Sequence, residues 1–251
     1  ALALLLLLRI PGVDLVGVTT VYGDTAVRAK VAKKILDAAG CSTPVIAGQS
    51  IPLGSPVPIW HAGTEGHGVL TARERDTPLE EMGIAEAAPE FIVDAVEKHG
   101  RDLTIICLGA LTNVATALQN KPSLKSRIGH IFFMGGGITY RRPLPRSLQW
   151  GCEYAADASH NIRCDVIAAR EVFDSGVPMT IVTNDVTTRV WWDGQAVQEL
   201  LGCSSPPDAV VVGTLMDVWL KYRSEIFGRE VTGTCPHDPL TVSEAIGSQF
   251  A

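Results

Sequence analysis

The chain has 251 residues and a formal net charge of -6, with 46% hydrophobic residues, 19% charged residues and a mean hydropathy of +0.20. This composition is typical of a globular protein with a sizeable core, and it excludes a disordered or fibrous chain. The negative charge argues against nucleic acid as a partner, because binding to a duplex requires clustered Lys and Arg.

The chain opens on an apolar run of eight residues, Ala1–Leu8. A helix that spans a membrane needs about 20 apolar residues, so this run is too short. No small-residue cleavage site follows it, which argues against a secretory signal. We therefore expect the first turns of a buried helix, and no contact with a membrane.

Apolar runs rich in β-branched residues alternate with helical periodicity along the rest of the chain. Strands are predicted at 15–21, 44–47, 103–108, 130–134 and 179–182, and helices at 25–39, 87–98, 165–174, 194–201 and 208–227, with one more beginning near Thr112. A Gly- and Pro-rich loop covers 48–70, and an insertion covers 138–158. This alternation predicts a single α/β domain over 1–251, with a mostly parallel central sheet of the open, Rossmann-like kind and helices on both faces.

Six cysteines are scattered along the chain without any Cys-x-x-Cys pair. This spacing argues against a zinc ribbon or a thioredoxin-type redox site. Cys107 lies inside a predicted strand, where a cysteine behaves as a small apolar side chain. We expect free thiols and, with them, a reducing cytoplasmic setting.

Polar residues and glycines directly follow the carboxyl ends of several predicted strands. In open parallel sheets, ligands bind outside the carboxyl ends of the strands. The segments at these ends are 22–24, 108–109, 134–135 and 184–185. We therefore expect the functional site at this edge of the sheet.

Three motifs occur in order along the chain: Gly-Ala-Leu-Thr-Asn at 109–113, Met-Gly-Gly-Gly at 134–137 and His-Asp-Pro-Leu at 237–240. With segments 17–24 and 185–187, they resemble the nucleoside hydrolases, the inosine/uridine-preferring N-ribosyl hydrolases. The resemblance implies an enzyme of purine and pyrimidine salvage that uses a calcium-activated water. It would hydrolyse the N-glycosidic bond of a ribonucleoside to ribose and free base. It also implies a homo-oligomer, either a dimer or a tetramer.

The resemblance assigns two calcium ligands to this chain, the backbone carbonyl of Leu108 and the carboxylate of Asp238. Calcium takes about six to eight oxygen ligands and lowers the pKa of a bound water. In the family, further ligands come from an Asp-x-Asp-x-x-x-Asp-Asp motif that directly precedes an apolar helix. That motif would lie immediately before Ala1, so we expect the sequence to be truncated there, and also after Ala251, where it stops within a helical pattern.

The resemblance also assigns roles toward the substrate. His237 would donate a proton to the leaving base, and Asp24, Met134 and Asn161 would contact the nucleoside. Simpler interpretations stay open for most of these positions. Asp238 could be only a helix N-cap, Asp24 a turn residue, Met134 a core residue and His237 a structural group.

The chain departs from the family pattern after residue 137. Ser159 stands where the family has a carboxylate that grips a ribose hydroxyl, and Glu153 could substitute for it. His61 begins a Gly-rich segment, 61–68, that matches a loop able to close over the substrate. Its two His and one Glu lack the His-Glu-x-x-His spacing of a zinc site. These departures keep an alternative open, a catalytically impaired nucleoside-binding module of the same fold.

Overall fold

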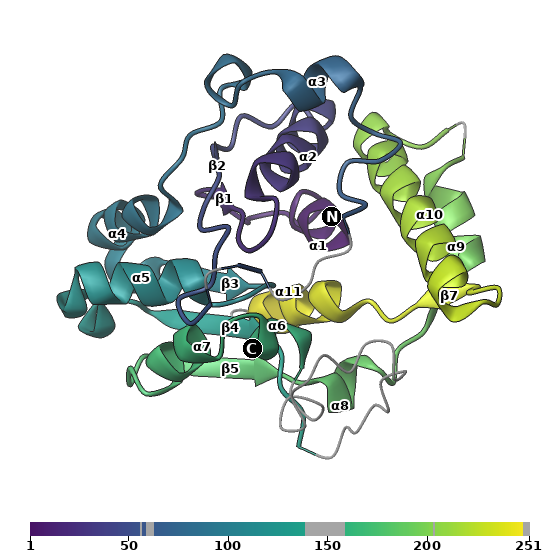
Figure 1. Cartoon of the computed structure of the whole chain (residues 1–251). Coiled ribbons are helices and arrows are strands. Elements are labelled where there is room, and N and C mark those ends of the chain that lie inside the picture. Colours follow the sequence, from purple (N-terminus) through teal and green to yellow (C-terminus); the bar gives the residue numbers. More distant parts are fainter. Residues whose placement is uncertain (56, 59–62, 139–158, 203, 248–251) are drawn as a thin grey trace.

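The computed structural model describes residues 1–55, 57–58, 63–138, 159–202 and 204–247 (Figure 1). The helices are α1 (Leu2–Leu7), α2 (Thr25–Ala38), α3 (Ala72–Asp76), α4 (Ala88–His99), α5 (Thr112–Asn120), α6 (His160–Cys164), α7 (Val166–Phe173), α8 (Asn184–Thr187), α9 (Gly194–Leu200), α10 (Pro207–Phe227) and α11 (His237–Gly247). The strands are β1 (Val18–Thr19), β2 (Val45–Ile46), β3 (Thr104–Cys107), β4 (His130–Met134), β5 (Met179–Val182), β6 (Trp192–Asp193) and β7 (Gly233–Thr234). Short 3-10 turns occupy Glu80–Met82, Gly100–Asp102 and Pro122–Ser126.

The sheet that organises the fold has three parallel strands in the order β3-β4-β5. A separate parallel pair, β1-β2, lies beside it, and β6-β7 form a short antiparallel pair. Each parallel neighbour is reached through a helical crossover, as parallel connections require. The predicted α/β class with parallel strands is therefore confirmed.

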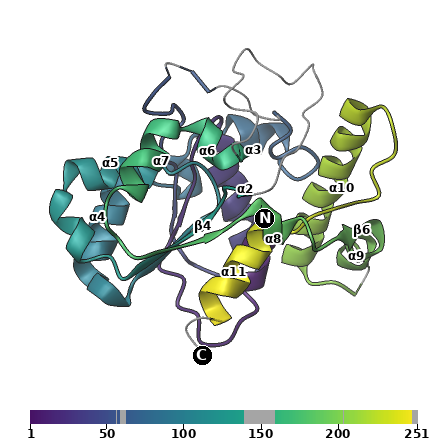
Figure 2. The ribbon, with the colours of Figure 1, turned by 90° about the horizontal axis from the view of Figure 1, so that it is seen from below.

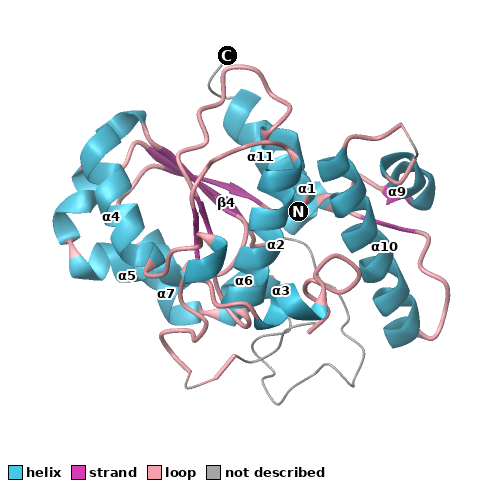
Figure 3. Ribbon diagram, turned by 90° about the horizontal axis from the view of Figure 1, so that it is seen from above, coloured by secondary structure: helices cyan, strands magenta, loops and turns pink. Residues whose placement is uncertain are grey.

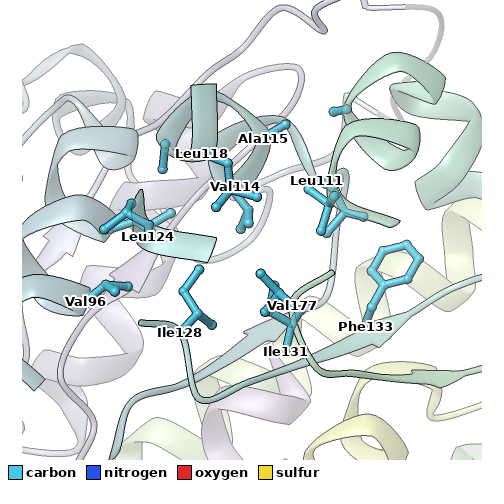
Figure 4. Packing of buried hydrophobic residues seen from close by; sticks show 14 of the residues in the cluster. Val96, Leu111, Val114, Ala115, Leu118, Leu124, Ile128, Ile131, Phe133 and Val177 are labelled. Atoms are coloured by element: carbon cyan, nitrogen blue, oxygen red, sulfur yellow. The ribbon is translucent and has the colours of Figure 1, made fainter. Parts of the chain in front are cut away.

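Helices cover both faces of the three-stranded sheet (Figure 3). On one face, Ile131 and Phe133 of β4 are fully buried in a cluster with Leu111, the N-cap of α5, and Val114 of α5 (Figure 4). Val172 of α7 belongs to the same cluster. On the other face, α11 packs against all three strands. Because successive side chains of a strand point to opposite faces, β4 must be apolar throughout, and its sequence, His-Ile-Phe-Phe-Met, meets that requirement after its first residue.

The apolar run at the start of the chain forms α1, as predicted. Ala3 and Leu5 are buried, and α1 packs against α2, α10 and α11 (Figure 2). The segment that follows α1 is joined to the start of α10, because Arg9 donates to Asp208 at 2.7 Å. Asp208 is only 1% exposed, so this ion pair holds a buried carboxylate.

The predicted helices 25–39, 87–98, 165–174, 194–201 and 208–227 and the strands 130–134 and 179–182 agree with the structure to within one or two residues. The strand predicted at 15–21 is wrong in length, because β1 contains only two residues and pairs with an equally short β2. Helices α3, α6 and α8 were not predicted, because they are too short to show a period, and the β6-β7 pair was not predicted either.

The described cysteines Cys41, Cys107, Cys164 and Cys235 are free, as expected. Desolvation raises the pKa of the Cys107 thiol to about 12, which fits a small apolar side chain in a strand. Among the helices of the described residues, none combines the length and the apolar character that crossing a bilayer requires.

Candidate active site

The carboxyl ends of β4 and β5 are level with each other, and the pairing continues past both strands. Met134 lies opposite Val182, and the N–H of Gly135 donates to the Val182 carbonyl at 3.1 Å. One step further, the N–H of Asn184 donates to the Gly136 carbonyl at 3.0 Å. The Gly-rich segment after β4 and the start of α8 therefore share one edge of the sheet.

Asn161 joins the ends of β3 and β4. Its Nδ2 donates to the Leu108 carbonyl at 3.2 Å and to the Met134 carbonyl at 2.9 Å, and it also lies 3.6 Å from the Met134 sulfur. Three residues that the sequence analysis selected are thus brought together. Both hydrogens of the amide are used on these carbonyls, so Oδ1 is the atom through which Asn161 can accept a further hydrogen bond.

Ser159 is buried next to the same edge, where its hydroxyl has a structural partner. The N–H of Gly136 donates to the Ser159 Oγ at 2.7 Å. A Cβ at Gly135 would lie 2.5 Å from the Phe133 ring and 3.2 Å from the Ser159 Oγ, so only glycine fits there. Ser159 therefore supports the turn after β4, at a position where the family resemblance implies a carboxylate.

His237 begins α11 and reaches across to the segment after β5. Its Nδ1 lies 2.6 Å from the Thr187 Oγ1, and Thr187 is fully buried at the end of α8. The backbone N–H of His237 donates to the Cys235 carbonyl at 2.9 Å, which sets the turn into the helix. The imidazole is thus held at one nitrogen by a residue 50 positions away.

Asp238 follows His237 in the first turn of α11 and is partly buried. Burial raises the pKa of its carboxyl group to about 6. Helix α1 packs against α11, the helix that carries Asp238. Desolvation favours the neutral form of a carboxyl group, and a bound cation would favour its charged form.

Asp24 caps α2, since its side chain accepts from the N–H of Val27 at 2.9 Å, and it is exposed. The turn before it is strained. Tyr22 has a φ of 64°, which is rare for a side chain of this size, and its N–H donates to the Gln49 carbonyl at 2.7 Å. These contacts agree with the simpler interpretation of Asp24 as a turn and cap residue. A role of Asp24 toward the substrate stays a prediction.

Two of the predicted substrate residues, His61 and Glu153, lie outside the described residues. The described end of the Gly-rich loop is anchored to α2 through Glu65. Arg28 donates from Nη2 to the Glu65 Oε1 at 2.7 Å and from Nη1 to the Val21 carbonyl at 2.9 Å. Glu65 therefore has an ion-pair partner in Arg28.

A second polar cluster, which the sequence analysis did not find, lies behind the edge of the sheet. Asp165 caps α7 with one oxygen and accepts with the other from the N–H of Leu53 at 2.8 Å and the hydroxyl of Thr112 at 2.7 Å. Next to Thr112, the amide of Asn113 donates to the Thr20 carbonyl at 2.9 Å. The motif at 109–113 therefore contributes structural contacts in its last two residues.

Comparisons with known proteins agree with this arrangement. The family described as inosine-uridine preferring nucleoside hydrolase matches residues 1–251. The protein of Oryza sativa subsp. japonica named "Probable uridine nucleosidase 2" is 27% identical over 257 aligned positions, which cover 100% of this chain and 71% of that protein. Uridine nucleosidase 1 of Arabidopsis thaliana is 29% identical over 245 positions, covering 96% of this chain and 68% of its own length. The solved structure of the purine-preferring ribonucleoside hydrolase from Gardnerella vaginalis has a TM-score of 0.76 at 25% identity, covering 99% of this chain and 76% of that one.

Proposed function

The chain belongs to the inosine-uridine preferring nucleoside hydrolase family, and from this premise we propose that it cleaves the N-glycosidic bond of ribonucleosides with water, releasing ribose and free base. The observation that supports the proposal is that Asn161 joins the ends of two strands. Its amide donates to the carbonyls of Leu108 and Met134, and α11, which begins with His237 and Asp238, packs against the same sheet. A hydrolase of this class must hold a sugar, supply a water and help a base to leave, and these groups suit those tasks.

Asn161 is the residue best placed to bind the ribose. Its amide hydrogens are engaged by two backbone carbonyls, which fixes the orientation of the side chain and leaves Oδ1 to accept from a sugar hydroxyl. Met134 contacts Asn161 and offers an apolar surface for the sugar ring. Asp24, His61 and Glu153 remain proposed contributors to the same binding site.

His237 is the proposed proton donor to the departing base. Cleavage develops positive charge on the sugar and negative charge on the base nitrogen. An imidazole can supply a proton to that nitrogen near neutral pH. The contact of Nδ1 with the Thr187 Oγ1 at 2.6 Å holds the ring at the start of α11.

We propose calcium as the cofactor, with the Asp238 carboxylate and the Leu108 carbonyl as two of its ligands. Both are oxygen donors of the kind that calcium prefers, and burial raises the pKa of the Asp238 carboxyl group to about 6. When bound, calcium would lower the pKa of a coordinated water. Among the described residues, His, Cys, Asp and Glu nowhere gather in a group of three or more that could hold a metal. Two oxygens are fewer than calcium requires, so residues 1–251 alone should bind it weakly in calorimetry, and tight binding would contradict this ligand set.

The activity is tested by incubating the purified protein with uridine and with inosine and measuring free base by chromatography and ribose by a reducing-sugar assay. Equal amounts of base and ribose, independent of added phosphate, are expected for a hydrolase. A requirement for phosphate would instead indicate phosphorolysis and contradict the proposal.

A second candidate function, nucleoside binding without turnover, is favoured by one observation. The hydroxyl at position 159 accepts from a backbone N–H, and a carboxylate that could grip a ribose hydroxyl is missing there. Losing one charged hydrogen bond to the sugar weakens binding by about 1.5–3 kcal/mol. Saturable binding of a nucleoside in calorimetry, with no release of base, would select this alternative.

We further propose a single domain that assembles as a dimer or tetramer and works in the cytoplasm in nucleoside salvage. The free cysteines in the described part of the chain support a reducing setting. Light scattering coupled to size-exclusion chromatography tests the assembly state directly. A monomer at micromolar concentration would contradict it.

A further inference from the structure

Arg163 is a cation whose side chain has no partner in the part of the chain that the structure describes. It lies in α6 and is partly buried, and its Nε is a buried donor without an acceptor there. None of the ion pairs between described residues includes it. A buried donor that makes no hydrogen bond costs free energy, and more so when it belongs to a charged group. An arginine in such a place points to an acceptor that comes from outside the chain.

Arg163 lines a small cavity at the join of α6 and α7. The cavity has a volume of about 120 Å³ and lies between segment 52–55 and residues 163–167. It has room for several waters or for one small oxyanion. The two walls are held together, because the N–H of Leu53 donates to Asp165 at 2.8 Å. A Cβ at Gly54 would lie 2.8 Å from the Ile167 side chain, so a glycine allows this close approach.

The charges around the cavity leave Arg163 without a counter-ion in contact among the described residues. The Asp165 carboxylate belongs to the same wall, but both its oxygens accept from donors of the protein. Arg28, whose charge acts on Cys164 as that of Arg163 does, is paired with Glu65 at 2.7 Å. A phosphate group complements an unpaired guanidinium, because the forked N–H donors match its oxygens and its charge balances the cation.

The cavity lies beside the candidate active site. Cys164, which also lines it, is buried in one cluster with Tyr22, after β1, and Ala110, after β3. Asn161, which binds the carbonyls that end β3 and β4, precedes Arg163 by two residues in α6. Side chains two positions apart on a helix do not face each other, so the cavity is a neighbour of the amide of Asn161 and not part of its hydrogen-bond set.

We propose that Arg163 and the cavity beside it form a binding site for a phosphate group. A phosphate ester carries about 1.5–2 negative charges at pH 7 and offers three acceptor oxygens, which would satisfy the Nε of Arg163 and supply its counter-charge. The phosphate is either a free ion or part of a nucleoside monophosphate whose nucleoside occupies the neighbouring site. The phosphate site stands without the proposed hydrolysis, and only its second source rests on that function.

The binding test is a calorimetric titration of the full chain with inorganic phosphate at constant ionic strength, which keeps the screening of surface charges fixed. The wild type should bind one phosphate per chain with a Kd of about 1 mM. Arg163→Gln should weaken this binding about tenfold or more, because the charge and the forked donors are lost. No saturation of the wild type by about 20 mM phosphate, or an unchanged Kd in Arg163→Gln, would overturn the proposal.

Arg170→Gln is the matched control. Arg170 lies on the adjacent helix α7, where its side chain is 85% exposed and paired with Asp174 at 3.5 Å. The substitution removes the same charge from the same part of the surface without touching the cavity, so phosphate should bind with the wild-type Kd. A loss in Arg170→Gln equal to that in Arg163→Gln would show a general effect of surface charge and overturn the site.

The two sources of phosphate are separated by comparing uridine with uridine 5′-monophosphate. If the nucleotide binds the wild type about tenfold more tightly than uridine, and this advantage is lost in Arg163→Gln, the site holds the phosphate of a nucleotide. If both bind equally while inorganic phosphate binds in an Arg163-dependent way, the site holds the free ion. Absence of base release from uridine would overturn the proposed function, and the titrations would still decide the phosphate site.

A measurement on the wild type covers the case in which Arg163→Gln fails to fold. Nitrogen-15 NMR detects the Nε–H group of each arginine, and the Arg163 signal is assigned through its loss in Arg163→Lys. Phosphate should shift this signal and slow its exchange with water, because the Nε–H then donates to a phosphate oxygen. An Arg163 signal that stays unchanged at saturating phosphate would overturn the proposal.

Discussion

Two clusters of polar side chains in this protein differ in how many of their hydrogen-bonding groups have partners inside the protein. The cluster around Asp165 is buried, with Asp165 2% and Thr112 1% exposed, and both carboxylate oxygens accept hydrogen bonds from protein donors. The cluster at the sheet edge is partly exposed. Among the candidate site residues, Asn161 retains an oxygen that can accept, and burial raises the pKa of Asp238, in the first turn of α11, to about 6.

The two clusters differ in how many of their hydrogen-bonding groups already have partners inside the protein, and this difference indicates different roles. A buried polar group whose hydrogen bonds are all made inside the protein stabilises the fold and has nothing left for a ligand. A partly exposed group with remaining capacity is able to bind one. We therefore expect substitutions in the first cluster to change stability, and substitutions in the second to change activity.

The largest effect is expected for Asp238→Ala. It should slow uridine and p-nitrophenyl riboside alike by about 10³-fold, because the carboxylate is needed whichever group leaves, and a lost cation contribution amounts to several kcal/mol. Steady-state kinetics on both substrates measure this. Asp174→Asn is the matched control, since Asp174 is an exposed carboxylate paired with Arg170, and it should have the wild-type rate. Rates within tenfold of wild type for Asp238→Ala would remove Asp238 from the site.

Asp165→Ala should lower the free energy of unfolding by about 3 kcal/mol, because the cap of α7 is lost, and the Leu53 N–H and the buried Thr112 hydroxyl lose their acceptor. Urea titration measures the loss, and kcat per folded molecule should stay the same. Asp165→Asn retains one oxygen and should cost less. If Asp165→Ala instead reduced kcat at wild-type stability, the distinction between the two clusters would be wrong.

His237→Ala should lower kcat for uridine by about 10²-fold and change p-nitrophenyl riboside little, because a general acid matters most when the leaving group is basic. The ratio of the two rates is the measurement. Equal slowing of both substrates, with normal stability, would reassign His237 to support of the ribose or the metal ligands.

The smallest effect is expected at a charged pair remote from both clusters. Glu74 accepts from Lys34 at 2.6 Å and from the N–H of Thr71 at 2.7 Å, and these contacts, Lys34 first, lower the pKa of Glu74 from 4.5 to about 2. A carboxyl with a lowered pKa in the folded state contributes stability above its unfolded pKa of 4.5, and this is lost as the pH falls toward 2. Glu74 is 31% exposed, so the contribution is only about 1 kcal/mol.

Glu74→Gln tests this pH dependence. Its free energy of unfolding should be about 1 kcal/mol below that of the wild type at pH 7, and the two should converge as the pH falls from about 4.5 to 2. A difference that is constant across this range would show that the effect is not electrostatic.

Much of the fold could be predicted because its elements are encoded locally. Strand β4 and helix α2 carry their own periodicity, and Asp24 and Gly40 bound α2 with residues that favour helix ends. The rule that parallel strands present their carboxyl ends together predicts a candidate site at this edge of the sheet. Short elements such as α6 and α8 could not be predicted, because four or five residues are too few for a period.

The amino-acid sequence by itself determined the fold class, most of the long helices and strands, and the identity of the residues at the sheet edge. The tertiary structure alone decided which of them touch. It joined Asn161 to the carbonyls of Leu108 and Met134, and His237 to Thr187, across 27 to 53 positions of chain. It also gave the Ser159 hydroxyl a backbone partner. The physical reason is range: periodicity and capping act within a few residues, whereas a hydrogen bond between distant segments depends on how the sheet and its helices pack.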